Sequence, residues 1–171
     1  MILEQNFTEE QKFRQALLIA LMIVINIGAL TALIYHLFYE EGVSTDNFTR
    51  ATIIFSGLMP LIITGLFFFL CRLKTTIDKE GIIVRFIPFH FKAKKYSWRE
   101  IKKCNVREYS PIAEYGGWGI KGKLFKKDLA YNVSGKIGLQ LEFTDGKKLL
   151  IGTLKPEELK AYLMQINQYV E

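Results

Sequence analysis

Two long stretches without charged side chains interrupt the pattern of apolar and polar positions along this chain. Residues 16–38 (23 residues) and 51–71 (21 residues) contain no Asp, Glu, Lys or Arg. A helix of about 20 residues spans the hydrocarbon core of a bilayer. The 100 residues that follow are too few to wrap two helices that are apolar on every side. We therefore predict two transmembrane helices rather than two buried core helices.

Small and polar side chains inside these stretches predict that the two helices pack as an antiparallel hairpin. An amide at membrane depth usually bonds a neighbouring helix, and small residues let two backbones approach closely. The candidate packing residues are Asn26, Gly28, Ala32, Ser56, Gly57 and Thr64. A second interpretation stays open, in which Asn26, Pro60 and Thr64 line the path of a small transporter or channel component.

After residue 71 the apolar residues change to the two-residue period of β-strands. About seven short strands are expected between residues 73 and 152, and Asp145-Gly146 between two alternating runs indicates a hairpin turn. Pro156 then begins an amphipathic helix whose apolar stripe comprises Leu159, Tyr162, Leu163, Ile166 and Val170. The pattern thus predicts a small antiparallel β domain with a C-terminal helix.

The chain divides into three predicted regions. Residues 1–15 form a polar N-terminal segment, read as a short helix or lead-in with Phe7 and Phe13 at the membrane interface; residues 16–71 form the transmembrane hairpin; residues 72–171 form the β domain. The sequence has no flexible linker between the second apolar stretch and the first strand. The β domain is therefore expected to lie against the bilayer surface.

Charge is distributed unevenly over these regions. Residues 1–71 hold three basic and six acidic side chains, whereas residues 72–171 hold 20 basic and 11 acidic ones. Lys12 and Arg14 precede the first apolar stretch, and Arg72 and Lys74 follow the second. Since positive residues beside membrane helices stay in the cytoplasm, we expect a multi-pass protein of the cell membrane (inner or plasma membrane) with both termini cytoplasmic.

The order of elements resembles that of bacterial PH-domain membrane proteins, in which a two-helix transmembrane hairpin leads into a PH-like domain. The segments that carry the resemblance are TIDKEGIIVRF (76–86), YSWREIKK (96–103), GGWGI (116–120) and YNVSGKIGLQLEFTDGKKLLIGTLKPEEL (131–159). The resemblance implies a membrane α-helical hairpin plus an α+β PH-like split β-barrel with a C-terminal capping helix. It also implies a membrane-anchored, non-catalytic interaction module that binds a protein or lipid partner at the cytoplasmic membrane face.

One departure from lipid-binding PH domains concerns the first hairpin. Eukaryotic members bind phosphoinositides with lysines and arginines clustered there, whereas this turn reads Asp78-Lys79-Glu80-Gly81. The departure argues against specific phosphoinositide recognition.

No residue pattern indicates catalysis, a metal or a cofactor. His36 and His90 stand apart from any Cys, Asp or Glu at metal-ligand spacing, and no phosphate-binding loop or nucleophile motif occurs. Cys71 and Cys104 form no disulfide or zinc framework. We expect no enzyme activity.

Two segments combine aromatic rings with lysines, a composition that suits an anionic membrane surface. Their candidate contact residues are Phe89, Phe91, Lys92, Lys94 and Lys95 in the first, and Lys123, Phe125, Lys126 and Lys127 in the second. The alternative for both is that the rings fill the core and the lysines are merely solvated. The expected partners are the bilayer, anionic headgroups, and an unidentified protein or a second copy of the chain; the nearby bilayer makes nucleic acid a weaker explanation of the basic charge.

Overall fold

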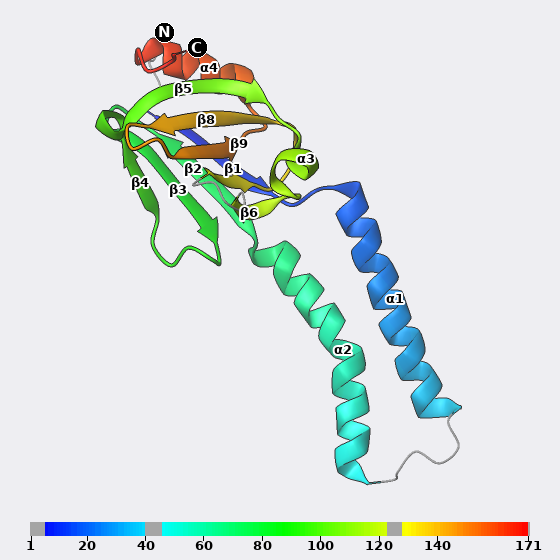
Figure 1. Ribbon diagram of the computed structural model, residues 1–171. Helices are drawn as coiled ribbons and strands as arrows, with labels where there is room; N and C mark the ends of the chain where they lie inside the picture. Colours follow the sequence, from blue (N-terminus) through cyan, green and yellow to red (C-terminus); the bar gives the residue numbers. More distant parts are fainter. Residues whose placement is uncertain (1–5, 40–45, 123–127, 171) are drawn as a thin grey trace. The chain divides into compact units, whose positions relative to one another are not determined.

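The computed structural model describes residues 6–39, 46–122 and 128–170, which form two compact units (Figure 1). One unit is the helical hairpin within Arg14–Leu70, and the described residues before and after it form the other. We call the second one the β unit.

The hairpin consists of helices α1 (Ala16–Phe38) and α2 (Asn47–Leu70). Both are long and apolar enough to cross a membrane, and only 6% of the most apolar window of each is buried. Such exposure is expected of helices whose solvent is lipid rather than of core helices in a water-soluble protein. The prediction of two long apolar helices is confirmed.

The β unit contains two sheets. Sheet A has the order β1-β2-β3-β4 and is formed by β1 (Phe7–Lys12), β2 (Arg72–Ile77), β3 (Gly81–Ile87) and β4 (Lys94–Ser97). Sheet B has the order β5-β8-β9-β7-β6 and is formed by β5 (Ile101–Glu108), β6 (Gly119–Gly122), β7 (Asp128–Asn132), β8 (Ile137–Phe143) and β9 (Lys148–Gly152). All pairings are antiparallel except that of β7 with β9.

Short helices complete the β unit. A 3₁₀ turn, η1 (Trp98–Glu100), joins the sheets and begins with a capping box in which Ser97 and Glu100 bond each other's backbone. Helix α3 (Pro111–Tyr115) follows β5, and α4 (Pro156–Gln165) ends the fold. As predicted, α4 begins at Pro156 and buries Leu159, Tyr162 and Leu163.

The core lies where the inner faces of both sheets meet α4. Its fully buried side chains include Leu73, Ile77, Ile82 and Phe86 from sheet A, Leu139, Leu141, Leu149 and Ile151 from sheet B, and Leu163 from α4. Across the described strands, the two sheets do not close into a barrel. The expectation of a mixed α+β fold with a C-terminal helix is therefore confirmed, without the closed barrel.

Strand β1 replaces the short helix or lead-in expected for residues 1–15. It pairs antiparallel with β2 along its whole length, from Phe7↔Ile77 to Lys12↔Arg72. Phe7 is buried, so the placement of its ring at the membrane interface is wrong. The apolar alternation that would have revealed this strand is hidden because two of its inward-facing residues, Glu9 and Gln11, are polar.

The two inward-facing polar residues of β1, Glu9 and Gln11, are buried, and the chain supplies hydrogen-bond partners for both. The Glu9 carboxylate accepts hydrogen bonds from Thr153 Oγ1 and from the backbone N–H of Leu154, each at 2.7 Å. The Gln11 amide donates to the carbonyl of Gly152 at 2.6 Å. These bonds tie β1 of sheet A to the last residue of β9 in sheet B and to the segment that follows it.

Candidate functional site

The register of sheet A brings three chain segments to one end of that sheet. Lys12, the last residue of β1, pairs with Arg72, the first of β2, and Arg72 pairs with Ile87, the last of β3. Only residues 13–15 separate β1 from α1, and only Cys71 separates α2 from β2. The loop that leaves β3 therefore begins at the sheet end where the chain passes to and from the apolar hairpin.

This β3–β4 loop, residues 88–93, presents two aromatic rings to solvent. Phe91 is 93% exposed and Phe89 is 59% exposed, and Lys92 beside them is exposed as well. Exposed apolar side chains that lie beside one another are more typical of a contact surface than single scattered ones. The alternative that these rings fill the core is wrong.

The base of the loop is fastened by His90. The backbone N–H of His90 donates to the carbonyl of Phe86 at 2.7 Å, and His90 Nδ1 accepts from the N–H of Phe86 at 3.1 Å. The imidazole meets the ring of buried Tyr131 edge-on, with centroids 5.1 Å apart. Burial, and next the charge of Lys94, lower the pKa of His90 from its ordinary value, so the ring is neutral near pH 7.

The remaining lysines of the segment differ in their environments. Lys94 and Lys95 are both exposed on β4, but the Lys94 amine donates to Tyr131 Oη at 2.7 Å. Lys94 therefore braces the loop rather than extending its basic surface. Of the other predicted contact residues, Lys123, Phe125, Lys126 and Lys127 lie outside the described residues.

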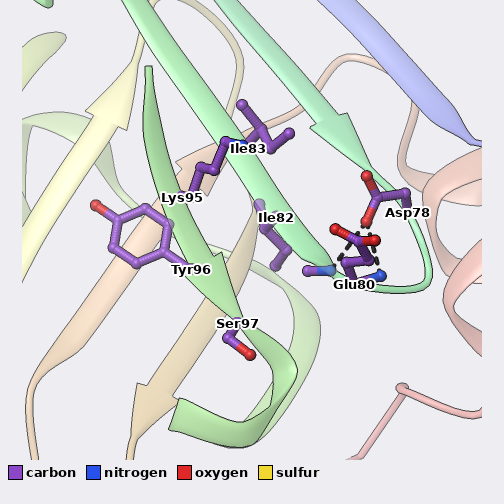
Figure 2. A pocket seen from close by; sticks show the side chains of 8 residues that line it. Asp78, Glu80, Ile82, Ile83, Lys95, Tyr96 and Ser97 are labelled. Atoms are coloured by element: carbon purple, nitrogen blue, oxygen red, sulfur yellow. Dashed lines mark hydrogen bonds between the residues drawn. The ribbon is translucent and has the colours of Figure 1, made fainter. Parts of the chain in front are cut away.

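A pocket of about 260 Å³ lies at the opposite end of sheet A, beside the β2–β3 turn (Figure 2). There Asp78 Oδ1 accepts hydrogen bonds from the N–H groups of Glu80 and Gly81, at 2.8 and 3.0 Å. The indole of Trp98 donates to the Asp78 carbonyl at 2.9 Å. These contacts use the polar groups of Asp78 to build the turn. Among the charged residues that line the pocket, Asp78 and Glu80 outnumber Lys95, which does not suit an anionic ligand.

A second pocket, of about 330 Å³, lies on the outer face of sheet B. One of its lining residues is Arg107, whose guanidinium donates to the Glu114 carboxylate (2.8 and 3.3 Å) and to Gln140 Oε1 (3.0 and 3.1 Å). Arg107 also donates to the carbonyl of Glu108 at 2.9 Å. All its donors are used within the fold, so this network holds α3 on the sheet and leaves Arg107 no donor for a ligand.

The hairpin brings together three of the six predicted packing residues. Asn26 is buried, and its amide donates to Thr64 Oγ1 across the pair at 3.0 Å. Gly57 is buried against Leu33, where an added Cβ would come within 2.8 Å of the Leu33 Cβ. The contact thus has a polar layer and a small-residue layer, seven residues apart in each helix.

Gly28, Ala32 and Ser56 are exposed and lie away from this contact. The reason is the helical repeat of about 100° per residue. Residues seven apart, such as Asn26 and Leu33, share a face, whereas Gly28 and Ala32 lie more than about 100° round the helix from Asn26. The predicted small-residue pair of the first helix is therefore not part of the hairpin contact.

Metal-ligating side chains do not cluster in the described ranges. No group of three or more His, Cys, Asp or Glu side chains that could hold a metal occurs among residues 6–39, 46–122 and 128–170. Burial in the core raises the pKa of the Cys104 thiol to about 12, which keeps it protonated and unreactive.

Comparison with known proteins adds no family to this picture. No protein-family model matches the chain, and no curated protein is significantly similar to it.

Proposed function

We propose that this chain is a membrane-anchored interaction module: two transmembrane helices hold a non-catalytic, PH-like β unit on the cytoplasmic membrane face, where it binds a lipid or protein partner. The observation that carries the proposal is the 93% exposure of Phe91, beside Phe89, in a loop that starts at the sheet end joined to both apolar helices. In this proposal the two rings enter the headgroup boundary.

The energetics of the loop favour the bilayer as its first contact. Burying an exposed phenylalanine ring contributes about 2 kcal/mol, and each lysine near an anionic surface adds roughly 1 kcal/mol. These gains are available without a large entropic cost of association, because Cys71 alone separates α2 from β2. A tethered loop needs only a weak individual affinity to stay bound.

The pairing of β1 with β2 supports a two-pass topology. Because these strands lie side by side, the segments before α1 and after α2 must be on the same side of any membrane that the hairpin crosses. An even number of crossings satisfies this condition and a single crossing does not. Lys12, Arg14, Arg72 and Lys74 beside the helix ends favour the cytoplasm as that side.

The contacts of Asn26 favour an anchor over a transport path. Its amide bonds the facing helix at Thr64 and the carbonyl of Met22 in its own helix. One amide hydrogen bond therefore joins the two helices and the other stays within α1, so both donors are used inside the hairpin.

A fluorescence experiment on the full-length chain in liposomes tests the proposal. A polarity-sensitive fluorophore is attached at Phe91→Cys, with the same label at Lys79→Cys in the β2–β3 turn as the matched control. We expect blue-shifted emission and quenching by spin-labelled lipid at position 91, and quenching by aqueous iodide at position 79. Equal access of iodide to both positions would refute membrane docking through this loop.

A further inference from the structure

The outer face of sheet A gathers basic side chains that lie apart in the sequence. Strands β1, β2 and β3 alternate, so that one set of residues enters the core and the other points away from it. The outward-facing set includes the basic residues Lys12, Arg72, Lys74, Arg85 and Lys95. All but Arg72 are exposed.

Positive charge on this face is poorly neutralised. Glu10 is its one nearby carboxylate among the described strands, and it pairs with Arg72 at 3.2 Å. In the register Lys74 stands between Glu10 of β1 and Arg85 of β3, but the Glu10 carboxylate pairs with Arg72, and neither Lys74 nor Arg85 has an ion-pair partner within the described parts of the chain. Like charges directly opposite each other destabilise a sheet. A bound anion would relieve this repulsion.

The position of Lys74 and Arg85 along their strands indicates the chemical class of the anion. Arg72 begins β2 one residue after Cys71, and Lys74 lies two residues further along. At about 3.3 Å per residue, the Lys74–Arg85 pair lies roughly 7 Å along the strand from Arg72. The polar headgroup layer of one leaflet is about 5–7 Å thick. The long side chains of Lys74 and Arg85 are therefore within reach of lipid phosphates when β2 begins at the membrane surface.

We propose that the outer face of sheet A binds the phosphate groups of anionic phospholipids, with Lys74 and Arg85 as its central pair and Lys12 beside them at the strand ends that continue into the hairpin. The proposal rests on the proposed function, because it requires the β unit to lie at the bilayer. Arginine suits phosphate through its paired N–H donors, and lysine acts as a compact charge beside it.

This site is distinct from the turn at the far end of the same sheet. The β2–β3 turn carries Asp78 and Glu80, whose charges disfavour phosphate. The basic face instead adjoins the strand ends that continue into the hairpin. An anionic lipid meets this face as soon as the loop has docked.

Energy transfer from tryptophan tests the proposal in the full-length chain. Trp98 and Trp118, the two tryptophans of the sequence, both belong to the β unit. The chain is reconstituted with an acceptor-labelled acyl chain carried by either phosphatidylglycerol or phosphatidylcholine, at equal mole fraction. The ratio of the two transfer efficiencies measures enrichment of anionic lipid around the β unit.

The critical variant is K74E/R85E, and K79E/K136E is its control with the same change of charge at exposed lysines off this face. For the wild type we expect a ratio above one at low salt that falls towards one at high salt. K74E/R85E should abolish the enrichment, because removing one cation weakens headgroup affinity by about fivefold. K74Q/R85Q should give an intermediate ratio, and K79E/K136E should keep that of the wild type.

A wild-type ratio of one, an unchanged ratio in K74E/R85E, or an equal loss in the control overturns the proposal. The label at position 91 distinguishes this failure from failure of the proposed function. If that label stays quenched by lipid in K74E/R85E, the loop docks and only the headgroup site is lost. If it is never quenched in the wild type, the docking itself is refuted.

Discussion

At the scale of single residues, three positions show the opposite of the burial that their residue type suggests. Glu9 and Gln11 lie inside because Thr153, Leu154 and Gly152 supply their hydrogen bonds. Phe91 lies outside although it is among the most apolar residues of the β unit. The buried pair holds β1 to the fold, and the exposed ring is free for a contact beyond it.

The hydrogen bond from Phe86 N–H to His90 Nδ1, which holds the base of the β3–β4 loop, depends on pH. The folded-state pKa of His90 lies below the ordinary 6.5, so the unfolded chain binds the extra proton more readily than the folded one. His90 therefore has little effect on the free energy of unfolding above about pH 6.5, and it lowers that free energy as the pH falls below this value. The other histidine, His36, belongs to α1.

We predict that the thermal stability of the wild-type β unit falls between pH 7 and pH 5, and that His90→Gln removes most of this slope. Protonation takes the Nδ1 lone pair that accepts from Phe86 N–H. The measurement is the melting temperature of both proteins across this range in one detergent. Parallel pH profiles would show that His90 does not set the dependence.

At the scale of elements, the two helices of the hairpin meet at two layers, and the layer at Gly57 has no room for a larger side chain. An added Cβ at Gly57 would collide with Leu33, whereas Gly65 in the same helix has open space around it. The two glycines therefore form a natural pair of test and control sites. Overpacking such a contact costs about 1–3 kcal/mol.

We predict that Gly57→Leu separates the helices and that Gly65→Leu does not. A disulfide between Asn26→Cys and Thr64→Cys reports the separation, because the native side chains are within hydrogen-bond distance at 3.0 Å. The yield of oxidised hairpin should fall severalfold with Gly57→Leu and stay unchanged with Gly65→Leu. Equal yields in both backgrounds would argue against close contact at Gly57.

The sequence predicts elements with a strong local period and misses features that depend on pairing. The two apolar helices, the turn at Asp145-Gly146 and the start of α4 at Pro156 follow from patterns within a few residues. The parallel pairing of β7 with β9 and the capture of β1 by β2 depend on partners distant in the chain. No local signal encodes them.

The candidate site is predicted only in part for the same reason. Phe89, Phe91 and Lys92 are adjacent in sequence, so their composition reveals them. Lys74 and Arg85 come together only through the register of β2 with β3. The alternation of exposed and buried positions in those strands is the signal that could have found them, once the pairing was assumed.

At the scale of the whole molecule, the pairing of β1 with β2 fixes which segments share a side of the membrane. We predict that Thr8→Cys and Lys79→Cys react with a membrane-impermeant maleimide only from the cytoplasmic side, and that Asp46→Cys reacts only from the opposite side. Intact and permeabilised spheroplasts give the two measurements. Opposite accessibility of positions 8 and 79 would contradict the pairing.

The strand pair also has a consequence for synthesis. Thr8 is made long before its partner Thr76 emerges from the ribosome, so the first strand waits without a neighbour while both helices enter the lipid. Joining two ends so far apart costs entropy that grows with the intervening length. Assembly of the helices as a hairpin brings the two strands close together before they pair. The entropy cost of pairing β1 with β2 is then smaller, so insertion of the helices into the membrane assists closure of the sheet.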